Sequence, residues 1–148
     1  MDVRIPELEL DNQLCFALYD ASRAVIRAYG PLLDELGLTY PQYLVMLALW
    51  QHGEVSVKDL SGLLQLEPAT VSPLLKRLEA TGYISRRRSP IDERLLLVST
   101  TARGQALRAE AERVPLEVVR RLGIGLSELE TLNVSLRRVI AAAAAVGS

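Results

Sequence analysis

The fold of this chain is decided by residues 56–98, which read SVKDLSGLLQLEPATVSPLLKRLEATGYISRRRSPIDERLLLV. Ser56 stands three residues before Asp59, a spacing that resembles a capping box and predicts the start of a short helix over 57–64. After a tight turn, a second helix is expected over 68–81, because a glycine follows it as a stop signal. Two short helices joined by such a turn form a helix-turn-helix.

The second predicted helix has an apolar face and a polar face. Its apolar positions recur at helical spacing and are expected to pack into the core: Val71, Leu74, Leu75 and Leu78. The residues left for the outside are Thr70, Ser72, Pro73, Lys76 and Arg77. Because Pro73 lies beyond the first turn, we expect a local bend or a delayed start of the helix.

A basic β-ribbon is predicted directly after the helix-turn-helix. Residues 83–88 and 94–98 each read as a strand, and the turn-forming residues 89–93 connect them. Three consecutive arginines, at positions 86–88, lie on the first arm, and Arg94 lies near the tip. A ribbon of this kind is narrow enough to reach the minor groove or the phosphates of DNA.

The distribution of charge supports this interpretation, although the net charge of −1 alone argues against nucleic acid. Residues 1–40 carry three basic and seven acidic side chains, so that part of the chain is acidic. Residues 68–94 carry six basic and three acidic side chains. A basic patch on a nearly neutral protein binds phosphate locally while the rest of the surface keeps the protein dissolved.

Composition limits the class of protein. The chain has 148 residues, of which 49% are hydrophobic, which is enough for one domain, 1–148, with its own core. It has one cysteine, Cys15, and one histidine, His52, which leaves neither a disulfide framework nor a metal site. No apolar run reaches the roughly 20 residues that span a bilayer. We therefore expect a cytoplasmic protein with no metal, no cofactor and no membrane association.

Two helices are predicted before the helix-turn-helix. The first begins at a cap formed by Asp11 or Asn12 and ends at Leu36. Gly30-Pro31 interrupts its pattern, so a kink or break is expected near that pair. The second helix follows Thr39 and has a proline in its first turn, where proline is well tolerated.

Two more helices are predicted after the ribbon, over 102–122 with a cap at Thr100 or Thr101, and over 128–146 with a cap at Ser127. The helices at both ends of the chain have an apolar face, and such a face needs a partner surface. We therefore expect a mainly α fold with a small β wing. Its parts are dimerisation helices over 10–37 and 101–146, and a winged helix-turn-helix over 40–99.

The single cysteine lies where a helix favours an anion. Cys15 is expected in the first turns of the first helix, whose positive dipole end stabilises a thiolate. Tyr19 follows four residues later on the same face. Tyr29 lies on nearly the same face but about 21 Å farther along a straight helix. Tyr29 can therefore meet Cys15 only across two antiparallel chains of a dimer, which Tyr40 could join from the second helix.

These elements and their motifs resemble the MarR (multiple antibiotic resistance regulator) family. The resemblance rests on the order of elements, on the segments 74–84 and 98–104, and on Asp92-Glu93-Arg94-Leu95 at the tip of the ribbon. It implies a homodimeric repressor that binds a near-palindromic operator in double-stranded DNA, with Arg94 in the minor groove and Asp92 holding it. The candidate DNA-binding residues are Thr70, Ser72, Lys76, Arg77, Arg86, Arg88, Asp92 and Arg94.

The sequence is also similar to one branch of this family, the organic hydroperoxide resistance regulators. The similarity rests on Cys15, Tyr29 and Tyr40, on TYPQY at 39–43 and on TVSPLLK at 70–76. It implies that a hydroperoxide oxidises Cys15 to a sulfenic acid and that the DNA is then released. Because the chain has no second cysteine, a mixed disulfide with a small thiol, or over-oxidation, would complete the switch.

Two alternatives stand beside this hypothesis. A lone cysteine is often a small core residue, so the chain could be a MarR-type repressor that a small aromatic ligand releases, with Cys15 only structural. A small cysteine peroxidase would be an enzyme, but His52 is 37 residues from Cys15 and the chain lacks a peroxidase-like motif. We therefore predict a regulator whose sensing residues are Cys15, Tyr19, Tyr29 and Tyr40, and not an enzyme.

Overall fold

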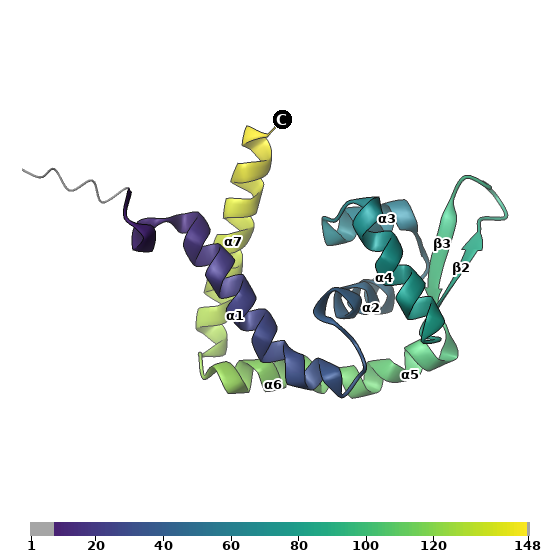
Figure 1. Cartoon of the computed structure of the whole chain (residues 1–148), viewed down its shortest axis with the longest axis horizontal. Helices are drawn as coiled ribbons and strands as arrows, with labels where there is room; N and C mark the ends of the chain where they lie inside the picture. Colours follow the sequence, from purple (N-terminus) through teal and green to yellow (C-terminus); the bar gives the residue numbers. More distant parts are fainter. Residues whose placement is uncertain (1–7, 148) are drawn as a thin grey trace, which may run out of the picture. The chain divides into compact units, whose positions relative to one another are not determined.

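The computed structural model describes residues 8–147 (Figure 1). They form two compact units that divide between Glu112 and Arg113. The first unit contains five α-helices and a small sheet, and the second contains two α-helices. The helices of the first unit are α1 (Leu14–Asp34), α2 (Tyr40–His52), α3 (Val57–Leu64), α4 (Pro68–Ala80) and α5 (Ala102–Ala111).

The start of α1 differs from the prediction. A 3-10 turn, η2 (Leu10–Asn12), occupies the predicted cap, and α1 begins after Gln13, whose side chain makes no capping hydrogen bond. Gly30-Pro31 does not break the helix, because α1 runs through this pair. The helix ends at Asp34, two residues before the predicted end at Leu36.

The start of α2 is confirmed. Thr39 Oγ1 accepts a hydrogen bond from Gln42 N, while Gln42 Oε1 accepts one from Thr39 N, so the two residues close a complete capping box. At the other end Gly53 has φ +73°, a left-handed conformation that favours glycine, and its N–H donates to Leu49 O. These two caps fix α2 between Tyr40 and His52.

The helix-turn-helix has nearly the predicted bounds. Ser56 Oγ accepts from Asp59 N at 3.0 Å at the start of α3. The turn after α3 contains Gln65, which has φ +55°. Pro73 neither delays nor ends α4, which runs continuously from Pro68 to Ala80.

The ribbon is part of a three-stranded antiparallel sheet, β1 (Val55–Ser56), β2 (Ile84–Arg88) and β3 (Leu96–Thr100), in the order β1-β3-β2. Arg86 pairs with Val98, which sets the register of the wing. The strand β1 was not predicted, because two residues carry too little periodicity to indicate a strand. The strand β3 begins two residues later than predicted, since residues 94 and 95 belong to the loop at the tip.

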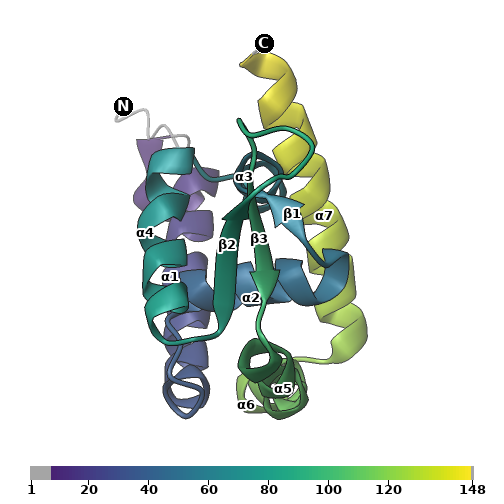
Figure 2. The same ribbon diagram turned by 90° about the vertical axis from the view of Figure 1, so that its right-hand side faces the viewer.

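The core of the first unit lies between the helix-turn-helix, α2 and the sheet. Figure 2 shows α4 beside β2 while α2 crosses behind the ribbon, and contacts join α2 with α3, α4 and β3. The predicted core residues Val71, Leu75 and Leu78 are buried, whereas Leu74 is half-buried. They pack with other side chains of at most 2% exposure: Val45, Met46, Leu49, Leu60, Ile84 and Val98.

The first turn of α5 lies directly on the chain between α4 and β2. Thr101 N donates to Tyr83 O, and Thr101 Oγ1 donates to Gly82 O at 2.5 Å. The same hydroxyl caps α5 by accepting from Gly104 N, so Thr101 is the cap, as predicted. Trp50 Nε1 of α2 donates to Gly104 O at 3.0 Å. A Cβ at Gly104 would lie 2.0 Å from Tyr83 O, so only glycine fits this close approach.

The second unit consists of α6 (Arg113–Leu122) and α7 (Leu126–Val146). The predicted helix over 102–122 is therefore two helices, α5 and α6. The predicted cap at Ser127 is wrong, because Gly125 is the N-cap of α7 and Ser127 lies inside the helix. Large apolar side chains of α7 are exposed, including Leu132, Val134 and Ile140. No helix among residues 8–147 is both long and apolar enough to cross a membrane.

The Gly104 contact predicts a large loss of stability when a single methyl group is added. Gly104→Ala should lower the free energy of unfolding by about 1–3 kcal/mol, because the backbone at Tyr83 has to move away from the new Cβ. Urea unfolding followed by circular dichroism measures the change. Gly62→Ala in α3 is the matched control, since its Cβ would meet nothing within 4 Å. It should raise stability by about 0.5–1 kcal/mol; equal effects of the two variants would contradict the close contact.

Candidate functional site

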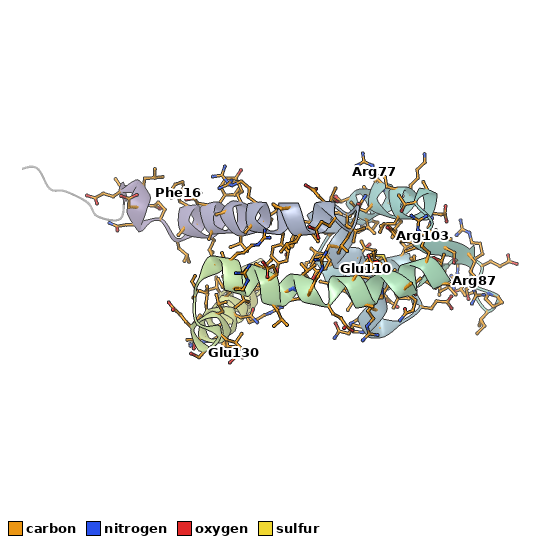
Figure 3. All side chains as sticks on the ribbon, turned by 90° about the horizontal axis from the view of Figure 1, so that it is seen from below. Phe16, Arg77, Arg87, Arg103, Glu110 and Glu130 are labelled. Carbon is orange, nitrogen blue, oxygen red and sulfur yellow. The ribbon has the colours of Figure 1, made fainter. Side chains whose placement is uncertain are left out.

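The outer face of α4 carries the predicted polar residues. Thr70, Ser72, Lys76 and Arg77 are all exposed, on the side opposite to Val71 and Leu75. Figure 3 places Arg77 of α4 and Arg87 of β2 at the outer surface of the first unit. A helix that buries one face and exposes hydroxyls and cations on the other is suited to lie in the major groove of DNA.

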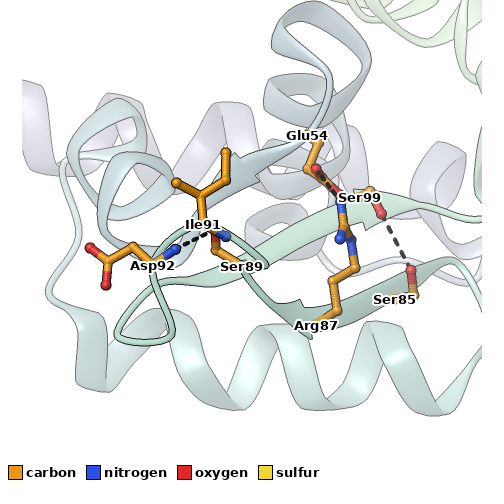
Figure 4. Close-up of polar contacts among 7 residues, drawn as sticks. All are labelled: Glu54, Ser85, Arg87, Ser89, Ile91, Asp92 and Ser99. Carbon is orange, nitrogen blue, oxygen red and sulfur yellow. Dashed lines mark hydrogen bonds and ion pairs between the residues drawn. The ribbon is translucent and has the colours of Figure 1, made fainter.

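Two of the three consecutive arginines form ion pairs within the protein. Arg86 donates through Nε and a terminal nitrogen to both oxygens of Glu79, at 3.3 and 3.1 Å, which ties the wing to the end of α4. Hydrogen bonding from Arg86 lowers the pKa of the Glu79 carboxyl. Arg87 binds Glu54 in the same bidentate manner at 3.3 and 3.0 Å (Figure 4).

These pairs divide the arginines of the wing by role. Arg86 has a side chain only 23% exposed, and its charge is balanced by Glu79, so it braces the wing. Arg88 makes no ion pair with any residue in the part of the chain that the structure describes, and its side chain is exposed. Of the two wing-strand arginines predicted to bind DNA, Arg88 is therefore the better placed for phosphate.

The loop at the tip of the wing is held by Ser89. Its side chain is buried, and its Oγ accepts hydrogen bonds from Ile91 N and Asp92 N, both at 3.2 Å (Figure 4). Ser89 N donates to Leu95 O, and Leu95 N donates to Asp92 O, both at 2.9 Å. These four bonds give a seven-residue loop a defined shape at the point where it projects from the sheet.

Asp92 and Arg94 form a bidentate pair on this loop. Asp92 Oδ1 accepts from Arg94 Nε and from Arg94 N, both at 3.1 Å, and Oδ2 accepts from the guanidinium at 3.2 Å. The Arg94 side chain lowers the pKa of the Asp92 carboxyl, and its backbone N–H adds to this effect. The Arg94 side chain is 90% exposed although Asp92 holds its guanidinium. An arginine presented in this way is preorganised to enter a narrow groove.

Three tyrosines meet where the end of α1 packs on the start of α2. The ring of Tyr29 lies 5.2 Å from that of Tyr40 and 5.9 Å from that of Tyr43, and the rings of Tyr40 and Tyr43 are 6.4 Å apart. Burial raises the pKa of Tyr43 to about 12, with contributions from Tyr29 and Tyr40. Burial also raises the pKa values of Tyr29 and Tyr40. All three phenols are therefore protonated hydrogen-bond donors at neutral pH.

Tyr43 was not among the predicted sensing residues. Its side chain is only 2% exposed, and its ring packs against both Tyr29 and Tyr40. The signal for it was present in the sequence, because Tyr40 and Tyr43 stand three residues apart and share a face of one helix.

Within one chain, Cys15 lies apart from the tyrosine cluster. Cys15 is the second residue of α1, and it is exposed and free. About 21 Å of helix separates it from Tyr29. Tyr19 is 61% exposed, and the guanidinium of Arg23 lies 4.3 Å from the centre of its ring. The structure therefore brings Tyr29 and Tyr40 together, as expected, and leaves Cys15 and Tyr19 on the open surface of α1.

No group of three or more metal-ligating side chains occurs within residues 8–147. The described residues offer an exposed thiol, a cluster of neutral phenols and a cationic wing.

Comparison with known proteins places this architecture in a family. A family model described as "Transcriptional regulator SarA/Rot" matches residues 27–110. The organic hydroperoxide resistance transcriptional regulator of Bacillus subtilis is 45% identical over 115 residues, which are 78% of each chain.

Solved structures of other proteins have the same fold as this chain. Overoxidized AbfR bound to DNA has a TM-score of 0.73 at 32% identity, over 89% of this chain and 93% of that one; AbfR is a protein of Staphylococcus epidermidis. The repressor CouR, bound to a 23-mer DNA duplex, has a TM-score of 0.82 over 93% of this chain and 99% of that one, and its 24% identity supports the fold alone. This chain belongs to the MarR-type family of winged-helix, DNA-binding transcriptional regulators and is not an enzyme.

Proposed function

We propose that this regulator is a homodimeric, cytoplasmic repressor that releases a near-palindromic operator when an organic hydroperoxide oxidises Cys15. The observation that carries the proposal is the pattern along α1, which holds an exposed thiol in its first turn and a clustered, neutral tyrosine fourteen residues later. The 45% identity to a regulator of organic hydroperoxide resistance supports the same chemistry.

The sensor requires two chains. Fourteen residues are close to four whole helical turns, so Cys15 and Tyr29 lie on nearly the same face of α1. If two α1 helices pack antiparallel about a two-fold axis, each Cys15 meets the partner's Tyr29, and Tyr40 follows because its ring contacts Tyr29. The exposed apolar side chains of α1, among them Leu14, Val25 and Ile26, supply surface for this packing.

The oxidation needs only the peroxide as a co-reactant. The Cys15 thiolate attacks the terminal oxygen of the hydroperoxide, which carries the proton; an S–O bond forms and the O–O bond breaks. The sulfur loses two electrons and becomes a sulfenic acid, while the departing alkoxide takes up a proton and leaves as an alcohol. Phenol hydroxyls donate hydrogen bonds to the thiolate without adding charge, which stabilises the reactive form of the cysteine.

The route from the thiol to the DNA is short. Oxidation replaces the thiolate and disrupts its hydrogen bonds with Tyr29 and Tyr40, which shifts α1 against α2. Because α2 contacts both α3 and α4, this shift reaches the helix-turn-helix and turns the two winged units of the dimer out of register. With one cysteine in the sequence, a mixed disulfide with a small thiol or over-oxidation then stabilises the released state.

On the DNA side, α4 would lie in the major groove and Arg94 in the minor groove of each half-site. Thr70, Ser72, Lys76 and Arg77 would face the bases and the phosphates from α4, and Arg88 would add a phosphate contact from the wing. In a symmetric dimer the two recognition helices would be about 34–36 Å apart, one turn of DNA.

Replacement of the thiol tests the sensing chemistry. In a gel shift, tert-butyl hydroperoxide should release the wild-type protein from its operator, whereas Cys15→Ser should stay bound, because a serine hydroxyl cannot form a sulfenic acid. Affinity before oxidation should be equal in both proteins. Release of both proteins would overturn the proposal. Release of both by a small aromatic acid such as benzoate, but not by peroxide, would instead establish the aromatic-ligand alternative.

The tyrosines are tested separately. Tyr29→Phe should slow formation of the Cys15 sulfenic acid by about tenfold, because one hydrogen bond to an anion is lost. Trapping with dimedone and mass spectrometry measures this rate. Tyr43→Phe is the matched control, since it removes a hydroxyl from the same cluster at a residue that is almost fully buried. If the sulfenic acid forms at the same rate in both variants and in the wild type, Tyr29 does not contact Cys15 across the two chains.

Arg94 tests the wing. Arg94→Ala should weaken operator binding by about 1–3 kcal/mol at constant salt, the effect of losing one groove contact. Arg108→Ala removes the same charge from the exposed surface of α5 and should leave the affinity nearly unchanged. Fluorescence anisotropy with a labelled operator measures the dissociation constants of both variants. If the two variants bind equally well, the wing does not enter the groove.

A further inference from the structure

The tip of the wing presents an apolar side chain that nothing in the first unit covers. Ile91 is 95% exposed, the highest value for any large hydrophobic side chain among residues 8–147. It lies in the loop between Arg88, the last residue of β2, and Arg94. Single exposed apolar residues are common on protein surfaces, but the way in which the loop presents Ile91 distinguishes it from them.

The loop holds Ile91 outward. The buried Ser89 hydroxyl accepts from the N–H groups of Ile91 and Asp92, so the backbone on both sides of the Ile91 side chain is fixed (Figure 4). Pro90 restricts the backbone directly before it. A loop of this shape loses little conformational entropy when Ile91 is buried by a partner.

The residues beside Ile91 point to the identity of that partner. Arg88 and Arg94 are exposed, Arg94 is held by Asp92, and both belong to the same end of the wing. A protein partner for this tip would have to bring acidic groups to both arginines and an apolar pocket between them. DNA offers both features in one surface, because phosphates line the minor groove and the C–H groups of deoxyribose form its walls.

We propose that Ile91 packs against the sugar wall of the minor groove beside Arg94 and adds an apolar contact to operator binding. This inference rests on the proposed entry of the wing into the groove. Ile91 has no hydrogen-bonding group, so it contributes through the fit of its branched side chain to the groove and releases no counterion from the DNA.

This assignment predicts a characteristic salt dependence. Ile91→Ser should weaken operator binding about tenfold, since it removes most of the apolar surface of the side chain. The slope of log affinity against log salt should stay equal to that of the wild type, because no phosphate contact is lost. Arg94→Ala should weaken binding, and Arg88→Ala, which removes the wing arginine that makes no ion pair among the described residues, should lower that slope by about one. Ile91→Val, which keeps the branched apolar surface, should bind within about twofold of the wild type.

Fluorescence anisotropy over a series of salt concentrations, together with sedimentation and a melting curve for each variant, separates the outcomes. If Arg94→Ala weakens binding and Ile91→Ser does not, the wing enters the groove and the Ile91 contact is wrong. If neither variant changes the affinity, the wing proposal itself fails. A loss of self-association in Ile91→Ser at unchanged operator affinity would assign this side chain to a protein contact and overturn the inference.

Discussion

The burial of α2 is the interaction on which the rest of the first unit depends, because α1, α3, α4, α5 and β3 all contact it. The side chains of Val45, Met46 and Leu49 are at most 2% exposed. Because they are closely packed, a displacement of α2 has to shift the elements that contact it. The same helix carries Tyr40 and Tyr43 of the aromatic cluster. One packed element thus links the phenols at the end of α1 with the helix-turn-helix.

Local signals that lie close together in the sequence were sufficient to predict most of the winged helix. The Thr39 and Ser56 caps gave the starts of α2 and α3, and the apolar spacing of Val71, Leu75 and Leu78 gave the buried face of α4. Features that depend on distant residues were missed. The strand β1 exists because Val55 pairs with Val98, forty-three residues away. Helix α1 continues through Gly30-Pro31 although both residues have a weak helix propensity, so the expected break does not occur.

In the candidate site, too, contacts between residues close in the sequence were predicted and contacts between distant residues were not. Asp92 and Arg94 are two residues apart, and a local motif correctly predicted their pairing. The partners of Arg86 and Arg87 are Glu79 and Glu54, and a count of positive charges cannot reveal that these carboxylates reach back to the wing. Tyr43 joins Tyr29 through the packing of α1 on α2, which periodicity alone does not specify.

The internal ion pairs of Arg86 and Arg87 have a consequence for how such a regulator searches a genome. Cations that are already neutralised displace few counterions from random DNA, so they add little to the affinity for the vast excess of non-operator sequence. The protein then spends less time trapped at wrong sites, and a larger share of its binding free energy comes from contacts that distinguish one sequence from another. Two surface carboxylates, Glu54 and Glu79, would in this way improve selectivity by holding Arg86 and Arg87 to the protein.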